Sequence, residues 1–283
     1  MSNTIRTHLT ALARERHPRT APTALRDTAR YLSHHFAAAG LDVSAHRFEA
    51  GGESYDNVIG MTPSPTDRTA APLILAAHYD TVEGSPGADD NASGLTVLLE
   101  VARRIAGAEL SRPAQFIAFC LEEENLLGSR AYVAHLLATS QAVHGAIVLE
   151  CVGCASDREG TQRTPPGIPV SVPTVGNFLA VIGNQPSGLF TARLTEAMRP
   201  SVPVIPLIVP GNGELLPDTR RSDHTAFWEG GFPAVMVTDT ANFRNPHYHR
   251  STDTIETINL PFLSSVADAI TTAVLALAGH PHA

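Results

Sequence analysis

Apolar residues along the chain follow two patterns, and each predicts a different kind of secondary structure. Helical spacing of the apolar positions predicts helices over 22–39, 93–107, 126–138, 189–199 and 260–279. Short apolar runs bounded by turn residues predict strands over 43–48, 57–61, 73–77, 116–121, 146–149 and 234–238. The last four of these runs are continuous rather than alternating, which is typical of strands that are buried on both faces.

Strands that alternate with helices predict an α/β fold with three α/β/α layers around a central mixed, mostly parallel sheet. Residues 1–283 are expected to form a single domain. The Pro/Gly-rich stretch 155–188 interrupts the alternation, and it predicts a loop-rich insertion over about 155–215. Long loops inside compact domains are usually functional, so we expect substrate specificity to depend on this insertion. The Pro/Thr/Ser-rich stretch 62–72 predicts a second, shorter loop.

Composition and charge narrow the class of protein. The chain is 43% hydrophobic and 17% charged, which is ordinary for a globular protein. Its formal net charge of -8 gives no electrostatic support for binding nucleic acid or acidic membranes, so neither partner is expected. The apolar runs are all expected to fall short of transmembrane length, and the N-terminus lacks the apolar centre of a signal peptide. These observations predict a cytoplasmic protein.

The three cysteines are too few for a disulfide framework. Cys151 and Cys154 form a CxxC pair, but a structural zinc would need two further ligands of matching spacing, and only Cys120 remains. We therefore do not expect a redox or zinc-ribbon site at this pair. The 13 histidines are numerous for the length of the chain, and they direct attention to other metal sites.

The residues that follow the four apolar runs carry the candidate chemistry. In chain order the runs end in His78-Tyr79-Asp80, Glu122-Glu123-Glu124, Glu150 and Asp239. Sites in open α/β sheets form beyond the carboxyl ends of the strands, so we expect these side chains to meet at one edge. Clustered carboxylates repel one another unless a positive charge compensates them. A divalent metal provides that charge, and zinc accepts histidine and carboxylate ligands.

Spacing within these segments suggests individual roles. His78 and Asp80 are two residues apart and face the same side of an extended chain, so Asp80 can hold the second ring nitrogen of His78; a surface His–Asp pair is the alternative. Glu122 and Glu123 can serve one site only where the strand ends and the chain turns. One of them can then bind a metal while the other accepts a proton from metal-bound water. Glu124 is interpreted as a solvated charge.

Two further segments are ambiguous when considered alone. Asp89 and Asp90 lie in an acidic turn before a predicted helix, and either could simply stabilise the N-terminus of that helix. The loop 245–254 contains His247 and His249, of which one can be a metal ligand while the other is a surface residue.

Six segments together resemble, in order and spacing, the M28 family of zinc peptidases, which includes aminopeptidases and glutamate carboxypeptidases. They are HYDT at 78–81, GADDNASG at 87–94, EEENLLGS at 122–129, LECVG at 149–153, SDHTAFW at 222–228 and NPHYHRSTDT at 245–254. The resemblance covers roughly 73–260 and is poor over 155–215. It implies the fold of the zinc-dependent exopeptidases and two zinc ions per chain.

The resemblance also implies which residues bind the two ions. One ion would be held by His78, Asp90 and Glu150, and the other by Asp90, Glu123 and His249. Asp90 would therefore bridge the two ions, whereas its neighbour Asp89 would not. Glu150 stands where many family members have aspartate, and either carboxylate can serve as the ligand.

Catalytic and substrate-binding roles follow from the same resemblance. Glu122 would be the general base, and Asp80 would orient His78. The family often has glycine in place of Asn125, but asparagine also tolerates left-handed backbone geometry, so we expect the turn to be retained. Candidate substrate contacts or supporting residues are Asp223, His224, Asn242 and Arg244. Arg244 could hold a substrate carboxylate, and a surface arginine without that role is the alternative.

The favoured function is a dizinc metallohydrolase that cleaves peptide or amide bonds, with an aminopeptidase as the first choice. Metal-bound hydroxide would attack the carbonyl, with Glu122 as the base. One alternative is a glutaminyl cyclase-like enzyme, which would use a single zinc, and another is an N-acyl amide hydrolase on the same scaffold. An inactive binding protein is disfavoured because no expected ligand is missing. The expected partner is a peptide or a small amide.

Overall fold

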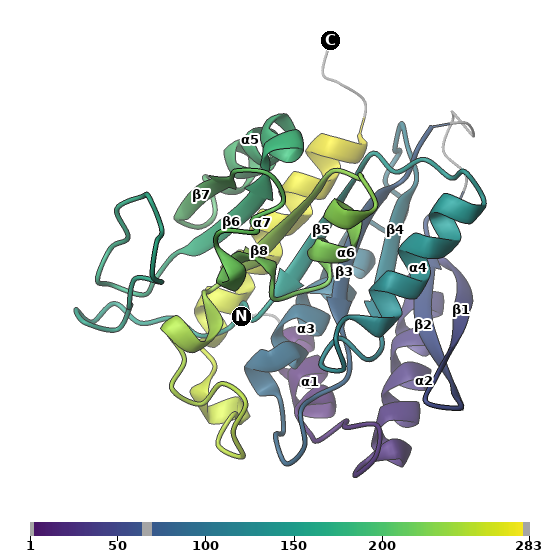
Figure 1. Ribbon diagram of the computed structural model, residues 1–283. Helices are drawn as coiled ribbons and strands as arrows, with labels where there is room; N and C mark the ends of the chain where they lie inside the picture. Colours follow the sequence, from purple (N-terminus) through teal and green to yellow (C-terminus); the bar gives the residue numbers. More distant parts are fainter. Residues whose placement is uncertain (1–2, 64–69, 280–283) are drawn as a thin grey trace.

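An eight-stranded mixed sheet forms the centre of the fold (Figure 1). The computed structural model describes residues 3–63 and 70–279, so part of the predicted loop 62–72 lies outside the described residues. The strands are β1 (Asp42–Ala50), β2 (Glu53–Met61), β3 (Leu73–His78), β4 (Ala114–Phe119), β5 (Gly145–Glu150), β6 (Leu179–Asn184), β7 (Val204–Val209) and β8 (Ala234–Thr238). Their order across the sheet is β1-β2-β4-β3-β5-β8-β6-β7.

The middle of the sheet is parallel and its flanks are mixed. Strands β4, β3, β5 and β8 run parallel to one another, while β1, β2 and β6 each pair antiparallel with a neighbour. The four parallel strands are the four continuous apolar runs of the sequence, and every residue of these strands is buried. Their carboxyl ends therefore meet at one edge of the sheet.

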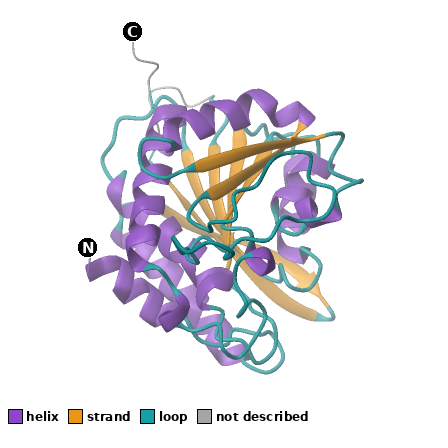
Figure 2. Cartoon of the chain, turned by 90° about the vertical axis from the view of Figure 1, so that its left-hand side faces the viewer, coloured by secondary structure: helices purple, strands orange, loops and turns teal. Residues whose placement is uncertain are grey.

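Helices cover both faces of the sheet, as Figure 2 shows from a second direction. They are α1 (Asn3–Leu12), α2 (Pro22–Ala38), α3 (Gly94–Arg104), α4 (Leu127–Ala138), α5 (Gly188–Met198), α6 (His224–Glu229) and α7 (Leu260–Ala278). Alternate residues of β3 belong to two different core clusters: Leu75 packs on the side of α3 and α7, and Ile74 on the side of α4 and α6. The predicted three-layer α/β/α class is confirmed.

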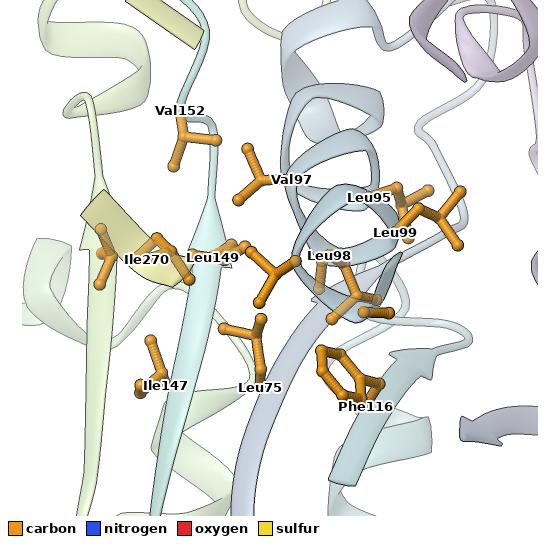
Figure 3. Packing of buried hydrophobic residues seen from close by; sticks show 14 of the residues in the cluster. Leu75, Leu95, Val97, Leu98, Leu99, Phe116, Ile147, Leu149, Val152 and Ile270 are labelled. Carbon is orange, nitrogen blue, oxygen red and sulfur yellow. The ribbon is translucent and has the colours of Figure 1, made fainter. Parts of the chain in front are cut away.

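The larger core lies between the sheet and helices α3 and α7 (Figure 3). Leu98 of α3 faces Leu75 and Phe116 of the sheet, and all three are at most 2% exposed. Burying a leucine or phenylalanine side chain contributes about 1.5–3 kcal/mol each relative to leaving it exposed. This packing fixes the strands whose ends carry the candidate site.

The second half of the predicted insertion belongs to the sheet. The sequence predicts a loop-rich insertion over 155–215, but β6, α5 and β7 all lie inside that range and extend the sheet on one flank. Only the stretch between β5 and β6 is an extended loop. The loop-rich description is therefore wrong for residues 179–209, although the helix predicted over 189–199 is present as α5.

Helix α7 corrects the expectation that no segment has transmembrane length. Among the described residues it alone is long and apolar enough to cross a membrane by length and composition, with a mean hydropathy of 1.7. Asn259 caps its N-terminus by accepting a hydrogen bond from the Phe262 N–H, as expected for asparagine at this position. Leu263, Val266 and Ile270 are fully buried against the fold, so α7 acts as a core helix in this structure.

Candidate metal centre

The carboxyl edge of the parallel strands brings the predicted metal ligands together. His78 and Glu150 are the last residues of β3 and β5, which are neighbours in the sheet. Glu122 and Glu123 follow the end of β4, the other neighbour of β3. His249 comes from the loop between β8 and α7. Residues that lie up to about 170 positions apart along the chain thus converge because the strands between them are parallel.

One group of ligand atoms surrounds His78. The Nε2 atom of His78 lies 3.1 Å from Asp90 Oδ1 and 3.4 Å from Glu150 Oε2. We call His78, Asp90 and Glu150 the inner cluster. Glu122 Oε2 is farther from the same nitrogen, at 3.9 Å. The inner cluster is enclosed, because the exposed side-chain fractions of these three residues are only 1%, 3% and 7%.

A second group surrounds His249. The Nε2 atom of His249 lies 3.0 Å from Asp90 Oδ2 and 3.2 Å from Glu123 Oε2. We call Asp90, Glu123 and His249 the outer cluster, because the His249 side chain is 34% exposed. Asp90 belongs to both clusters, with one carboxylate oxygen in each. That is the geometry required of a carboxylate that bridges two metal ions.

Unsatisfied polar atoms show that these residues fit a metal. Among the described residues, both ring nitrogens of His78, both oxygens of Asp90 and Glu123 Oε1 are buried without a hydrogen-bond partner. Such atoms are costly to leave unpaired, and buried polar groups in native proteins are nearly always satisfied. Imidazole nitrogens and carboxylate oxygens are the ligand types that zinc prefers beside thiolates. The cluster therefore has the donor set and the unfilled bonding capacity of a cation site.

The pKa shifts of these groups reflect the same crowding of charge. Burial raises the pKa of Glu122 well above its usual value, and repulsion from Glu150 and Glu123 adds to the shift. Burial and repulsion from Asp90 raise the pKa of Glu123 to about 7. Burial alone would lower the pKa of His249, but the neighbouring carboxylates of Asp90 and Glu123 raise it to about 10. In the absence of a metal the site thus retains protons to balance its carboxylates.

Comparison with known proteins identifies the family. The family model for "Peptidase family M28" matches residues 57–274. The chain belongs to peptidase family M28. The resemblance on which the metal ligands were assigned is thereby confirmed, and the chain is a hydrolase of the metallopeptidase class.

Two relatives illustrate the range of the family. The uncharacterized protein YfbL of Escherichia coli K12 is 31% identical over 274 residues, which cover 90% of this chain and 82% of YfbL. The aminopeptidase YwaD of Bacillus subtilis 168 is 28% identical over 235 residues, which cover 78% of this chain and 44% of YwaD. The chain thus spans less than half the length of that aminopeptidase.

Solved structures share the fold. The LapA aminopeptidase of Legionella pneumophila superposes with a TM-score of 0.78 at 22% identity, covering 100% of this chain and 73% of LapA. BSAP, a zinc aminopeptidase of Bacillus subtilis, gives a TM-score of 0.62 at 25% identity, covering 82% of this chain and 52% of BSAP. The glutaminyl cyclase of Tannerella forsythia gives 0.66 at 20% identity, covering 96% of this chain and 95% of the cyclase. Similarity to LapA and to the cyclase, below 25% identity, concerns the fold alone.

Asp80 was expected to orient His78, but its hydrogen bonds go elsewhere. Its Oδ1 is 3.6 Å from His78 Nδ1, which is longer than a hydrogen bond. Its two oxygens instead accept hydrogen bonds of 3.1 Å each from the backbone N–H groups of Glu122 and Glu123. Asp80 therefore fixes the turn that carries the predicted base and the predicted outer ligand.

Two supporting residues did not emerge as such from the sequence. Asp253 accepts hydrogen bonds from the backbone N–H groups of Asp89 and Asp90, and so holds the turn that carries the bridging carboxylate. Ser222 donates a 2.8 Å hydrogen bond to Glu150 Oε2. Both residues lie in the segments 222–228 and 245–254 that carry the M28 resemblance, and this was the only signal available for them.

Left-handed backbone conformations occur at or beside several of the candidate metal ligands. Leu121 (φ 61°), Cys151 (φ 50°) and His249 (φ 59°) all have positive φ angles, which are unfavourable for residues other than glycine. Leu121 precedes Glu122, and Cys151 follows Glu150. Asn125 also has a φ of 66°, in agreement with the expectation that asparagine retains a turn for which the family often uses glycine. Conformational cost of this kind is commonly concentrated at functional sites.

The predicted residues of the segment 222–228 are buried. Asp223 and His224 are both 0% exposed. His224 Nε2 lies 2.8 Å from the carbonyl oxygen of Thr219, and its ring packs edge-on against Trp228. Burial raises the pKa of Asp223 to about 7, and the carboxylates of Asp80 and Glu150 lie close enough to contribute. Asp223 thus borders the inner cluster, whereas His224 stabilises α6.

Arg244 and Asn242 occupy different environments. The Arg244 side chain is 7% exposed, donates hydrogen bonds to Gln162 Oε1 and to the Phe178 carbonyl oxygen (2.8 Å each), and lies over the Phe178 ring. It therefore attaches the loop before β6 to the loop that carries His249. Asn242 accepts a 2.8 Å hydrogen bond from Arg221, which also donates to the Tyr248 hydroxyl.

The remaining candidates lie outside the two clusters. Glu124 is partly exposed and forms ion pairs with His17 and Arg19, which agrees with its interpretation as a solvated charge. His247 Nδ1 lies 3.0 Å from the Thr252 hydroxyl at the surface. Asp239 is buried and accepts hydrogen bonds from the backbone N–H groups of 154 and 241.

An apolar pocket opens beside the inner cluster. Its lining includes Glu150 and Tyr248 together with apolar side chains of β6, β8 and the loop before β6. Those side chains include Ile168, Val170, Phe178, Ile182 and Met236. The Tyr248 ring stacks on the His249 ring at 3.9 Å between centroids, so the pocket borders both clusters.

Proposed function

We propose that the chain is an aminopeptidase that uses two zinc ions. The observation that carries this proposal is the position of Asp90, which directs one oxygen to each of two histidine-containing clusters. His78, Asp90 and Glu150 would hold the inner ion, and Asp90, Glu123 and His249 the outer ion. Zinc, when bound, lowers the pKa of water and polarises a carbonyl group.

Glu122 is the general base of this proposal. It lies beside the inner cluster, at 3.9 Å from His78 Nε2, and its carboxyl group is buried. Its pKa is raised in the metal-free site, and positive charge entering the site would allow it to ionise. Glu122 then accepts the proton of the attacking water and returns it to the leaving amine. Asp80 holds the Glu122 backbone in place through the hydrogen bond described above.

The apolar pocket determines the preferred substrate in this proposal. Its walls offer contacts to an apolar side chain, and Glu150 and Tyr248 belong to its lining. A peptide whose N-terminal residue is bulky and apolar would place that side chain in the pocket and its first peptide bond at the clusters. Aminopeptidases named among the relatives include leucine aminopeptidases, which supports this preference.

A glutaminyl cyclase-like enzyme with one zinc ion is the second candidate, supported by the similarity of fold. The presence of both clusters favours two ions. Elemental analysis distinguishes the two candidates, since about two zinc ions per chain support the aminopeptidase and about one supports the cyclase.

Substitution Glu122→Gln tests the proposed base. We expect this variant to retain two zinc ions and to lose at least about 10²-fold in kcat, the usual scale for a missing general base. The assay compares leucine and phenylalanine anilides that have a free amine with their N-acetylated forms. Glu124→Gln is the matched control, because Glu124 lies outside both clusters, and it should retain full activity. Near-complete activity in Glu122→Gln would refute the assignment of the base. Cleavage of only the acetylated substrates by the wild-type protein would indicate a deacylase.

A further inference from the structure

Arg16 is a buried arginine on the side of the metal centre that faces the N-terminal helices. It lies between α1 and α2, outside the residues matched by the family model, and it is 0% exposed. Arginine is almost never fully buried unless it is paired. A buried cation at this place therefore calls for an explanation.

The guanidinium group of Arg16 joins the turn that follows His78 to the turn that precedes Asp90. Its Nε donates a 2.8 Å hydrogen bond to the carbonyl oxygen of Tyr79, which lies between His78 and Asp80. Its Nη1 and Nη2 donate to the carbonyl oxygens of Pro86 (3.0 Å) and Gly87 (3.2 Å), on the turn before Asp90.

Further hydrogen bonds attach this group to its own segment. Nη1 also donates to the carbonyl oxygens of Leu12 and Arg14, and the Arg16 backbone N–H donates to the Thr81 hydroxyl at 2.9 Å. One side chain thus connects the N-terminal segment to the turn 79–81 and to the turn 86–87.

Gly87 lies where the chain packs too closely for a side chain. Its φ angle is 58°, and a Cβ atom at this position would lie 3.0 Å from Arg16 Nη2 and 2.2 Å from the Asp90 carbonyl oxygen. Both the close approach and the left-handed conformation require glycine here. The same Cβ atom would lie 2.5 Å from Thr81 Cγ2, so glycine allows the turn before Asp90 to pack against both Thr81 and Arg16.

The guanidinium contacts described above are all with backbone carbonyl oxygens. None of these contacts neutralises the charge of Arg16 with a carboxylate. Burial lowers the pKa of Arg16 to about 10, while Asp80, Asp90 and Asp253 oppose the shift from nearby. The guanidinium remains charged at neutral pH and stabilises these carboxylates through space. It thereby offsets part of the repulsion among the acidic groups before any metal binds.

We propose that Arg16 is a positioning residue that holds the turn after His78 and the turn before Asp90 at the spacing the inner metal ion needs. This inference rests on the proposed zinc function. Lysine cannot replace arginine in this role, because a single ammonium group cannot direct separate hydrogen bonds to carbonyls on two turns in the way a planar guanidinium does.

Zinc affinity, measured by competition with a chromophoric chelator, tests the proposal. We compare the wild-type protein with Arg16→Lys, Arg16→Met and the control Arg104→Met, each shown to be folded by circular dichroism. Arg104 lies at the far end of α3 and forms ion pairs with Glu100 and Asp268, so its loss should lower stability without changing the metal turns. Supporting residues of metal sites typically contribute 10–100-fold to metal affinity. We expect at least about a tenfold loss of zinc affinity in both Arg16 variants, and wild-type affinity in Arg104→Met.

The outcomes separate this inference from the proposed function. Wild-type protein that binds no zinc would refute the proposed function itself. Wild-type protein that binds zinc, together with undiminished affinity in either folded Arg16 variant, would overturn the role of Arg16 alone. An equal loss in Arg104→Met would also overturn it, because the effect would then reflect general stability. If Arg16→Met does not fold, the result for Arg16→Lys decides.

Discussion

The two ligand clusters share Asp90 but differ in how the fold presents them. The inner cluster takes His78 and Glu150 from the last residues of two adjacent buried strands. The outer cluster takes Glu123 and His249 from a turn and a long loop, and the His249 side chain is 34% exposed against 1% for His78. Ligands on strands have their backbone positions fixed by the sheet, whereas a ligand on a loop depends on the contacts of that loop.

This difference suggests that the two proposed ions are not equivalent. An ion in the inner cluster would be shielded from solvent and held by preorganised ligands. An ion in the outer cluster would be open to water and to competing chelators. We therefore expect a tightly held inner ion and a more exchangeable outer ion, and the following experiments test that expectation.

Asp90→Asn should have the largest effect, because Asp90 is common to both clusters. An amide cannot carry the negative charge that a bridging ligand provides. The metal ions would stabilise the transition state, and losing several kcal/mol of that stabilisation corresponds to at least about a 10³-fold fall in activity. Zinc content should fall for both clusters when measured by elemental analysis after dialysis. Retention of two ions per chain would show that Asp90 does not bridge them.

His249→Ala should remove the outer ion and leave the inner ion in place. The zinc content should fall from about two to about one per chain, with at least about a 10²-fold loss in kcat/KM because one of the two metal roles is lost. His247→Ala provides the matched control, since His247 lies in the same loop but contacts Thr252 at the surface. Loss of both ions in His249→Ala would contradict the independence of the inner cluster.

Lowering the pH should release the outer ion before the inner ion. Zinc requires deprotonated ligands, and in the metal-free site the pKa is about 7 for Glu123 and about 10 for His249. Protons therefore compete at two outer ligands but at only one inner ligand, His78, whose pKa is also raised well above its usual value by the surrounding carboxylates. Each proton displaced changes the affinity by up to about tenfold per pH unit. Zinc occupancy in a zinc buffer at pH 8, 7 and 6 measures the order of release. Loss of the inner ion at a higher pH than the outer ion would contradict the expected order of release.

The folding stability of the zinc-free protein should decrease as the pH rises, whereas zinc binding should increase. The pKa of His249 is raised from 6.5 to about 10 in the folded state. The stability that this shift contributes is fully present below about pH 6.5 and is lost as the pH rises through about 10. Thermal unfolding of zinc-free wild type and His249→Ala, compared between pH 6.5 and 10, isolates this contribution.

The parts of the fold that follow from the sequence are those with local signals. The four buried parallel strands are continuous apolar runs, and α3 has its apolar stripe at helical spacing. Strand β7 was missed because Pro206 lies within it, and proline argues against a strand unless the strand lies at the edge of a sheet, as β7 does. Strand β6 was missed because it lies within the Pro/Gly-rich stretch 155–188.

The residues of the candidate site also differ in whether a local sequence signal identifies them. His78 and Glu150 could be proposed as ligands because they follow strands whose ends must meet. The partners of Arg16 could not be predicted, because Tyr79 is 63 residues away along the chain and no local pattern links them. Asp80 could be placed near the site, but its bonding to the turn of Glu122 depends on tertiary geometry. The assignments of base and ligands remain predictions until the substitutions above are tested.

The apolar pocket and the metal clusters draw on different stretches of the chain. Ile168 and Val170 come from the loop before β6, whereas none of the six residues in the clusters and the base lies between 155 and 215. The loop is attached to the rest of the site through Arg244, which contacts Gln162 and the backbone of Phe178. Residues 163–177 could therefore be replaced by the corresponding loop of another family member to change selectivity. The replacement should keep Gln162 and Phe178, which bind Arg244, and leave the residues of the clusters and the base unchanged.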